Sequence, residues 1–425
     1  MKEVLFPYGK EKVSYKFDEE ELIGVLTSSI EEYKPTMDEA ELVADALKNP
    51  VGSVKLSELA KGKKNIVIIA SDHTRPVPSK IIMPQMLAEI RKGNPDADIT
   101  ILIATGCHRG TTKEELVAKF GEDIVNNEKI YIHDCDEREK LINIGTLPSG
   151  GECEINSIAI NADLLVAEGF IEPHFFAGFS GGRKSVLPGI AGRTTVLANH
   201  CSEFIDSEYS RTGILENTPI HKDMLWAAEQ AKLAFIVNVV LNGDKKVIFA
   251  TAGNCKDAHK KGTDFLSSLC GVEAVPADVV ISTNGGYPLD QNVYQAVKGM
   301  TAAEATVKEG GVIIMLARSN DGIGGDHFYH QLADEKDINK TMEVFLSRDR
   351  NETVPDQWQT QIMLRILMRA TVIYVSEMPD DKVSQMHMIP AKSLHDAIER
   401  AKEILGKENI KIVAIPDGVS VIVEK

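Results

Sequence analysis

The order of apolar and amphipathic segments constrains the fold of this chain more than any other feature of its sequence. An apolar run at residues 65–72 is followed by a helical stretch at residues 80–92, and residues 99–106 and 112–121 repeat the pair. Short continuous apolar runs predict strands that are buried on both faces, and a helix between two such strands joins them in parallel. The sequence therefore predicts an α/β fold with largely parallel sheets covered by helices.

A second series of the same kind predicts a second domain. Apolar runs recur at residues 277–286, 310–319, 370–378 and 410–418, with helical stretches between them. A chain of 425 residues also exceeds what a single core usually serves. We therefore predict two α/β domains, residues 1–269 and residues 270–425, with the active site in the cleft between them.

The net charge and the hydropathy pattern exclude two classes of function. The chain carries a net charge of −16, whereas proteins that bind nucleic acid need an excess of clustered Lys and Arg. No apolar run approaches the roughly 20 residues of a membrane span, and residues 1–17 lack the apolar centre of a signal peptide. We expect a cytoplasmic protein with no nucleic-acid partner and no membrane partner.

The six cysteines are scattered through the chain and form no C-x-x-C pair. This spacing is typical of reduced thiols in a cytosolic protein rather than of a zinc knuckle or a disulfide framework. Cys107 differs from the other five because His108 follows it directly.

Titratable and hydrogen-bonding residues follow three of the predicted strands. In a parallel sheet, ligands bind beyond the carboxyl ends of the strands, so these residues could face one crevice. Carboxylate, hydroxyl and guanidinium groups at such ends can grip a phosphate or a substrate carboxylate, although Asp and Thr also cap strand ends without further function. The residues concerned are Asp72, Thr74, Arg75, His108, Arg109, Glu168 and His174.

Three of the eleven histidines, His108, His174 and His200, have surroundings that suit chemistry. Histidine transfers protons near neutral pH and is the commonest metal ligand in proteins. Each also has an ordinary interpretation: a surface residue for His108, a hydrogen-bonded core residue for His174, and a cation at a helix C-terminus for His200. The chain has no H-E-x-x-H motif, so spacing alone does not indicate a zinc site.

The stretch from residue 172 to residue 192 combines a histidine, several glycines, an Arg-Lys pair and a proline. Residues 178–185 differ at one position from a phosphate-binding G-x-x-x-x-G-K-S loop, since Arg183 occupies the place of the second glycine. Residues 178–182 also spell G-x-S-x-G, but a nucleophile elbow needs a strand directly before the serine and a helix directly after it. Lys184 suits either an anion-binding side chain or a covalent anchor.

Taken together, these segments resemble the family of nickel-dependent lactate racemases, within the broader group of 2-hydroxyacid racemases and epimerases. The resemblance rests on "SDHTRP", "ATGCHRG", "EPHFFAGFSGGRKSVLPGIAG" and "ANH", and it continues through "NGGYPLDQNVYQAVKGMTAAEA" and "PDQW". These segments occur in the expected order over nearly the whole chain. The likeness implies an isomerase in which the lysine of the central segment anchors a nucleotide.

The cofactor that the resemblance implies is a nickel-pincer nucleotide, a pyridinium-3-thioamide-5-thiocarboxylic acid mononucleotide that offers two sulfur donors and one carbon donor to nickel(II). By resemblance, Lys184 is its covalent attachment point and His200 is the protein ligand of nickel. His108 and His174 correspond to the two acid/base residues. The resemblance further implies cofactor-binding roles for Asp72, Thr74 and Arg75 and substrate-binding roles for Arg75, Gln295 and Lys298.

The reaction that the resemblance implies is the interconversion of D- and L-lactate through pyruvate, with hydride transferred to and from the cofactor. Such an oxidation avoids removal of the C2 proton, which is very weakly acidic beside a carboxylate. Two histidines suit this reaction because each enantiomer needs a base for its hydroxyl group. The alternative is a racemase or epimerase of another 2-hydroxyacid such as malate. The expected partners are the small 2-hydroxyacid and, transiently, the proteins that synthesise the cofactor.

Overall fold

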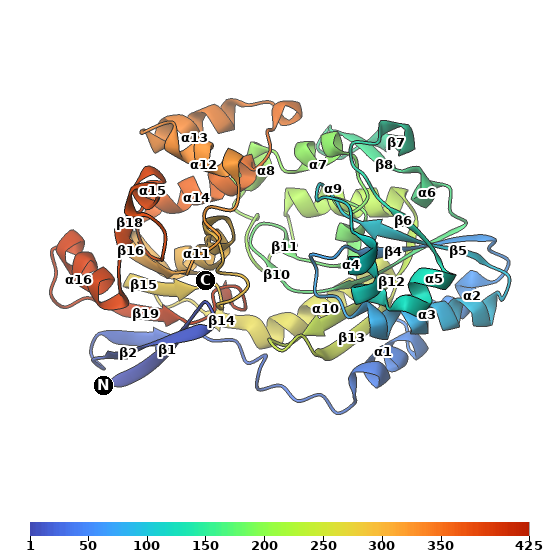
Figure 1. The fold of residues 1–425 in the computed structure, drawn as a ribbon, viewed down its shortest axis with the longest axis horizontal. Helices are drawn as coiled ribbons and strands as arrows, with labels where there is room; N and C mark the ends of the chain where they lie inside the picture. The colour runs from blue at the N-terminus through green and yellow to red at the C-terminus, as the bar shows by residue number, and fades with distance from the viewer. Residues whose placement is uncertain (425) are drawn as a thin grey trace. The chain divides into compact units, whose positions relative to one another are not determined.

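In the computed structural model, which describes residues 1–424, the chain divides into two units that each hold a six-stranded sheet. The N-terminal unit comprises residues 30–200 and 214–269. The C-terminal unit comprises residues 1–29, residues 201–213 and the chain from residue 270 onward. Figure 1 labels the helices and most of the strands of both. The predicted α/β fold with largely parallel sheets is confirmed.

The sheet of the N-terminal unit has the strand order β13-β12-β9-β4-β5-β6. Every neighbouring pair is parallel except β12 and β13, which are antiparallel. Strands β4 and β5 pair without a shift up to Ser71 and Ala104, so the residues that follow the two strands start at one edge of the sheet. The strands are β4 (Asn65–Ser71), β5 (Asp98–Ala104), β6 (Lys129–Ile132), β9 (Leu164–Phe170), β12 (Leu233–Leu241) and β13 (Val247–Gly253).

Amphipathic helices cover this sheet because their apolar residues recur at helical spacing. In α3 (Ser79–Gly93), the side chains of Ile82, Met86 and Ile90 lie on one face and are buried against the sheet. Helices α1 and α2 pack beside α3, as Figure 1 shows. The other helices that begin in this unit are α1 (Glu39–Lys48), α2 (Leu56–Ala60), α4 (Lys113–Phe120), α5 (Glu122–Asn127), α6 (Ser157–Ile160), α7 (Arg193–Asn199), α9 (Pro219–Gln230) and α10 (Cys255–Cys270).

Two small antiparallel pairs stand outside the main sheet of the N-terminal unit. One is formed by β7 (Leu141–Thr146) and β8 (Glu152–Asn156), and the other by β10 (Pro173–His174) and β11 (Gly178–Phe179). The second pair lies within the glycine-rich stretch that the sequence analysis selects.

The sheet of the C-terminal unit has the order β18-β17-β16-β15-β19-β3, and all its neighbouring pairs are parallel. Its strands are β3 (Leu22–Val25), β15 (Ala277–Thr283), β16 (Val307–Leu316), β17 (Thr371–Val375), β18 (Ile389–Ala391) and β19 (Ile412–Ile415). Two further strand pairs are β1 (Lys2–Tyr8) with β2 (Glu11–Phe17), and β14 (Gly271–Glu273) with β20 (Ile422–Glu424). Its helices are α8 (Ser202–Asp206), α11 (Val293–Thr306), α12 (Asp326–Ala333), α13 (Ile338–Ser347), α14 (Gln357–Arg369), α15 (Asp380–Gln385) and α16 (Leu394–Leu405).

Two segments of the predicted first domain, residues 1–29 and residues 201–213, group with the C-terminal unit. The first does so because β3 is the edge strand beside β19. The second carries α8, where the side-chain amide of Gln361 donates to the carbonyl of Ser202 at 3.0 Å. The local sequence does not show that a strand pairs with a partner near the other end of the chain. The sequence therefore predicts only one domain boundary, between residues 269 and 270.

No helix within residues 1–424 is long and apolar enough to cross a membrane. The longest, α10, has 16 residues, and a span needs roughly 20 predominantly apolar ones.

Candidate active site

Asp72 and His108 form a hydrogen-bonded pair beyond the ends of β4 and β5. The Nδ1 atom of His108 lies 2.8 Å from the Oδ2 atom of Asp72, and the Thr74 hydroxyl donates to Oδ1 of Asp72 at 2.6 Å. The side chain of Asp72 is 1% exposed and that of His108 is 45% exposed. Because the carboxylate accepts from Nδ1, the Nε2 atom of His108 can exchange a proton with a ligand. A carboxylate that orients an imidazole in this way is the arrangement of a general base.

The surroundings of Asp72 stabilise its negatively charged form. Burial alone would raise its pKa, but the hydrogen bonds from His108 and Thr74 and the positive charge of Arg75 outweigh burial, so the pKa lies below its ordinary value. Asp72 is therefore a carboxylate at neutral pH. Arg75 is exposed, so its guanidinium can meet an anionic ligand.

Backbone contacts fix the turn that carries His108. The amide of His108 donates to the carbonyl of Thr105 at 3.0 Å, and Gly106 has a φ of +56°, which glycine adopts without strain. The amide of Gly106 donates to the carbonyl of Gly189 at 3.0 Å, and the amide of Gly189 donates to the carbonyl of Lys184 at 3.1 Å. These contacts place His108 and Lys184 in one region of the N-terminal unit.

Phe176 lies among three of the predicted site residues. Its ring centroid is 4.5 Å from that of His174 and 5.4 Å from that of His200, both edge to face. The ammonium of Lys184 is 6.0 Å from the same ring, which is buried. Phe176 therefore brings together a candidate proton carrier, a candidate metal ligand and the candidate anchor. Sequence reasoning missed this role of Phe176. The only feature of the sequence that points to it is an aromatic residue two positions after His174.

His174 is presented by a tight antiparallel turn. It lies opposite Gly178 in the pairing of β10 with β11, and its Nδ1 atom accepts from the amide of Ala177 at 3.3 Å. The proton of the neutral ring is therefore on Nε2. Gly178 has a φ of +74°, and a Cβ atom there would lie 2.2 Å from the carbonyl oxygen of Ile214. The turn that presents His174 thus requires glycine at this position.

His200 is buried and neutral. It follows α7, and its Nδ1 atom donates to the carbonyl of Val196 at 2.9 Å, which leaves the lone pair on Nε2. Burial, with the nearby positive charge of Lys184, lowers the pKa of His200 to about 4. His200 is therefore not a cation that stabilises a helix C-terminus at neutral pH. A neutral imidazole with an oriented lone pair suits a metal ion.

Arg183 explains the imperfect phosphate-binding motif. Its side chain is buried, and its guanidinium donates to the carbonyls of Ala177 and Phe179, each at 2.8 Å. Its Nε atom donates to Nδ1 of His221 at 3.0 Å. Burial lowers the pKa of Arg183 to about 10, so it stays protonated at neutral pH. Arg183 therefore holds the turn before Lys184 from the inside and does not occupy a phosphate cradle.

Ser180 lacks the setting of a hydrolase nucleophile. Its hydroxyl donates to the carbonyl of Phe170 at 3.0 Å and accepts from the amide of Glu172 at 2.9 Å. A short 3-10 helix, Gly182–Ser185, follows in place of the α-helix that a nucleophile elbow needs. The G-x-S-x-G letters are a structural turn.

The buried Glu168 and the half-buried Lys119 lie near the segment of Asp72 and Arg75. The Lys119 ammonium donates to the carbonyl of Arg75 at 3.1 Å, and Glu168 accepts from the hydroxyl of Ser79. Burial raises the pKa of Glu168 and lowers the pKa of Lys119, and the attraction between the two opposite charges opposes both shifts. Nothing in the sequence distinguishes Lys119 from a surface lysine on an amphipathic helix.

Gln295 and Lys298 belong to the C-terminal unit, where they lie three residues apart on α11. Residues at this spacing share one face of a helix, and both side chains are half-buried. Asn292 caps the helix by accepting from the amide of Gln295 at 2.9 Å. The assignment of both residues to the substrate stays a prediction.

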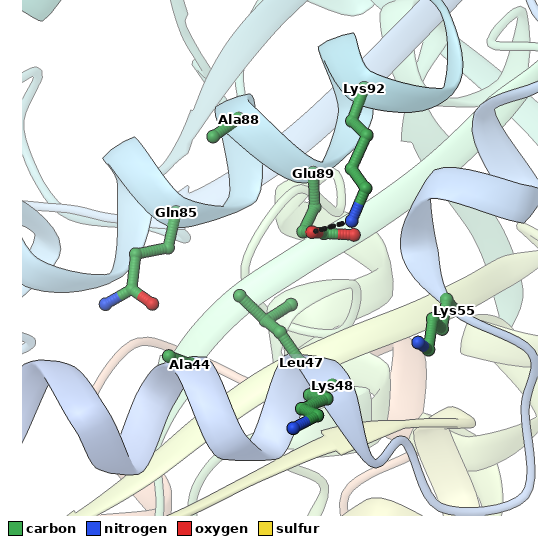
Figure 2. Close-up of a pocket in the computed structure, with 8 residues that line it drawn as sticks. All are labelled: Ala44, Leu47, Lys48, Lys55, Gln85, Ala88, Glu89 and Lys92. Carbon is green, nitrogen blue, oxygen red and sulfur yellow. Dashed lines mark hydrogen bonds and ion pairs between the residues drawn. The ribbon is translucent and has the colours of Figure 1, made fainter.

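A hollow of about 400 Å³ between α1 and α3 contains none of the predicted site residues. Figure 2 shows its lining, in which Leu47 faces an ion pair between Glu89 and Lys92 with an N–O distance of 3.2 Å. Solvated lysines around an open hollow do not indicate a ligand. We therefore place the candidate active site at the histidines and not here.

Another candidate metal site in residues 1–424 is the cluster of Asp134, Cys135 and Asp136, whose ligand atoms lie within 4.8 Å of one another. Arg193 occupies both carboxylate oxygens of Asp136, each at 2.7 Å. The carboxylate is thus already neutralised by a guanidinium.

Comparison with known proteins identifies the family. Two family models match the chain: the lactate racemase N-terminal domain over residues 8–213 and the lactate racemase C-terminal domain over residues 272–423. The lactate racemase of Thermoanaerobacterium thermosaccharolyticum is 55% identical over 426 residues, which cover 100% of both chains. The lactate racemase of Lactiplantibacillus plantarum is 55% identical over 419 residues, which cover 98% of this chain and 99% of that protein.

Solved structures agree with these relatives. The apoprotein of the Thermoanaerobacterium thermosaccharolyticum lactate racemase matches with a TM-score of 0.96 and 55% identity over 100% of both chains. A protein from Thermotoga maritima matches with a TM-score of 0.64 at 19% identity, over 92% of this chain and 100% of its own, which shows a shared fold alone. The predicted isomerase class is confirmed by the two racemases that match at full length. This chain belongs to the lactate racemase family.

Proposed function

We propose that this chain is a lactate racemase, which interconverts D- and L-lactate. The observation that carries the proposal is 55% identity to two lactate racemases over essentially the full chain. Two candidate proton carriers support it, His108 beside Asp72 and His174 beside Phe176. Racemisation of a 2-hydroxyacid needs a base for the hydroxyl group of each enantiomer.

The proposal includes a nickel-pincer nucleotide attached to Lys184, with His200 as the protein ligand of nickel(II). The residues present fit such a group. His200 is neutral and keeps a lone pair on Nε2, and imidazole is a suitable donor for nickel. Lys184 and His200 both contact the ring of Phe176, so a group bound to both side chains has its two attachment points together.

When bound, the nucleotide supplies a hydride acceptor and donor, so that lactate can be oxidised to pyruvate and reduced again from the other face. The chain's own residues handle the proton. His108 offers the lone pair of Nε2, because Asp72 holds its Nδ1 proton, whereas His174 offers an N–H group at Nε2. One ring can thus accept the hydroxyl proton while the other donates a hydrogen bond, and the reverse direction exchanges these roles.

Charged and polar side chains complete the proposed site. The exposed guanidinium of Arg75 suits either the phosphate of the nucleotide or the carboxylate of lactate. Thr74 and Asp72 are proposed to line the cofactor, and Gln295 and Lys298 are proposed to bind the substrate.

The test is production of the chain together with the proteins that synthesise the cofactor, which we propose act on it transiently. We expect an intact mass increased by one mononucleotide, bound nickel, and conversion of either lactate enantiomer to a mixture of both. Lys184→Ala should carry no adduct and no activity, whereas Lys222→Ala, an exposed lysine of α9, should retain both. Full activity of Lys184→Ala would contradict the role of Lys184 as the attachment point. Turnover of malate in place of lactate would show that the substrate is a different 2-hydroxyacid.

A further inference from the structure

Cys107 and Cys135 follow two neighbouring strands. Strands β5 and β6 are parallel, with Ile103 opposite Ile132 at the end of their pairing. The hydroxyl of Thr105 donates to the carbonyl of His133 at 2.6 Å, which joins the two loops just beyond the strands. The chain therefore brings the third residue after β5 close to the third residue after β6.

The paired ends of β5 and β6 bring the side chains of Cys107 and Cys135 close enough to interact, and their surroundings differ. Cys107 is exposed and Cys135 is buried. The hydrogen bond from the Cys135 thiol, with the positive charge of Arg193, lowers the pKa of Cys107 even though burial and Asp136 oppose the shift. The same contact raises the pKa of Cys135. An accessible thiol with a lowered pKa beside a second thiol has the features of an oxidisable pair.

The other four cysteines lack these features. Cys153, Cys201, Cys255 and Cys270 are all buried. Burial raises the pKa of Cys153, Cys255 and Cys270 to about 12. Buried thiols of this kind react slowly with oxidants, so oxidation should select Cys107.

We propose that Cys107 and Cys135 are a site of reversible thiol oxidation that forms a disulfide beside His108. With a hydroperoxide as the oxidant, the Cys107 thiolate attacks one peroxide oxygen and becomes a sulfenic acid as the O–O bond breaks. The Cys135 sulfur then attacks the Cys107 sulfur, and the sulfenic oxygen leaves as water. With hydrogen peroxide, two thiols lose two electrons and two protons in total, and one peroxide becomes two molecules of water.

The disulfide would alter the turn that carries the candidate base. Cys107 lies inside the turn that closes from the amide of His108 to the carbonyl of Thr105. Both thiols are free, and two sulfur atoms that are not bonded lie farther apart than the roughly 2.05 Å of a disulfide bond. Closing that gap pulls Cys107 toward Cys135 and changes the contact between His108 and Asp72. This inference does not depend on the proposed reaction, because it concerns only thiols and one imidazole of the chain.

The experiment treats the purified full-length protein with a small excess of hydrogen peroxide, blocks the remaining thiols under denaturing conditions and maps the peptides by mass spectrometry. We expect a Cys107–Cys135 disulfide, loss of two hydrogens in the intact mass, and reversal by dithiothreitol. Cys153→Ser is the matched control and should form the same disulfide. Cys135→Ser should stop at a Cys107 sulfenic acid that dimedone traps. Cys107→Ser should form neither the sulfenic acid nor the disulfide. Because Cys107 is exposed, this second variant still tests the proposal if the substitution of the buried Cys135 prevents folding.

The imidazole resonances of His108 supply the second readout. They should shift when the wild-type protein is oxidised, return after reduction, and stay in place when peroxide is added to Cys107→Ser. Two results would overturn the proposal: oxidation that begins at one of the four other cysteines, or a Cys107–Cys135 disulfide that leaves the His108 resonances unchanged.

Discussion

Arg183 and His200 each show how the surroundings of one side chain decide between two interpretations of a motif. Arg183 occupies a glycine position of a phosphate-binding pattern, yet its guanidinium turns inward and binds the carbonyls of Ala177 and Phe179. His200 has the position of a helix-end cation, yet burial keeps it neutral. In both cases the sequence motif does not show which way the side chain points, because tertiary packing determines its orientation.

Asp72→Asn tests the orientation of the candidate base. The variant removes the carboxylate that accepts from Nδ1 of His108, so the imidazole loses the contact that leaves its lone pair on Nε2. We expect racemisation rates in both directions to fall by about 10²-fold or more, while the Lys184 adduct remains. Thr74→Val removes one hydrogen bond to Asp72 and should have a smaller effect. Unchanged rates in Asp72→Asn would show that His108 does not need Asp72.

His221→Gln tests the pH dependence of stability. Burial, with the charges of Arg183 and Lys256, lowers the pKa of His221 from its ordinary 6.5 to about 3. As the pH falls from 6.5 towards 3, the unfolded chain binds a proton that the folded chain does not. The free energy of unfolding therefore falls by up to about 1.4 kcal/mol per pH unit in this window. The variant should lose this part of the slope in urea unfolding between pH 7 and pH 4, and an identical slope would refute the assignment.

At the scale of elements, the alternation of strands and helices is predictable from the sequence, and several contacts of the site are not. The apolar runs at residues 65–72 and 99–106 correspond to β4 and β5, and the helical segment at residues 80–92 corresponds to α3. Their burial makes the apolar pattern continuous, which is what sequence reasoning detects. The contact of Phe176 with His174, His200 and Lys184 depends on the tight β10–β11 turn. Each of its two strands has only two residues, which is too short for a periodic hydrophobic pattern in the sequence.

Arg183→Met tests the clamp on that turn. The carbonyls of Ala177 and Phe179 would lose their charged donor. The carbonyl of Ala177 still accepts from the amide of Phe179 at 2.9 Å, whereas an unsatisfied buried carbonyl at Phe179 costs about 1–3 kcal/mol. We expect the free energy of urea unfolding to fall by about 1–3 kcal/mol, and the yield of Lys184 adduct to fall with it. Lys184→Met, the adjacent half-buried position, should change stability far less. Equal stability of the two variants would show that the hydrogen bonds from Arg183 do not stabilise the turn.

At the scale of the whole molecule, the chain passes between the two units more than once. Residues 1–29 and 201–213 belong to the C-terminal unit although residues 30–200 belong to the N-terminal unit. Sequence patterns place a strand along the chain but do not say which sheet it joins, so the hydropathy of the first 29 residues leaves this grouping open. The predicted domain of residues 1–269 is therefore not the segment that should fold independently.

A fragment of residues 1–269 tests this organisation. Strand β3 would lack its partner β19 in the fragment. The amide of Leu26, which donates to the carbonyl of Ala414 at 2.8 Å in the full chain, should therefore exchange hydrogen much faster. Strands β4 and β5, which pair within the N-terminal unit, serve as the internal control. Equal protection of the Leu26 amide in the fragment and in the full chain would show that the segment of β3 does not depend on the C-terminal sheet.

We propose that this chain racemises lactate by moving a hydride and not by removing the C2 proton. The most direct measurement is the fate of the C2 hydrogen when L-lactate that carries deuterium at C2 is incubated in ordinary water with the cofactor-loaded protein. A hydride that is stored and returned stays out of exchange with solvent, so the D-lactate formed should keep its deuterium. Deprotonation at C2 by His108 or His174 would place the deuterium on an exchangeable imidazole nitrogen. D-lactate that has lost its deuterium to the solvent would therefore contradict the proposed hydride transfer.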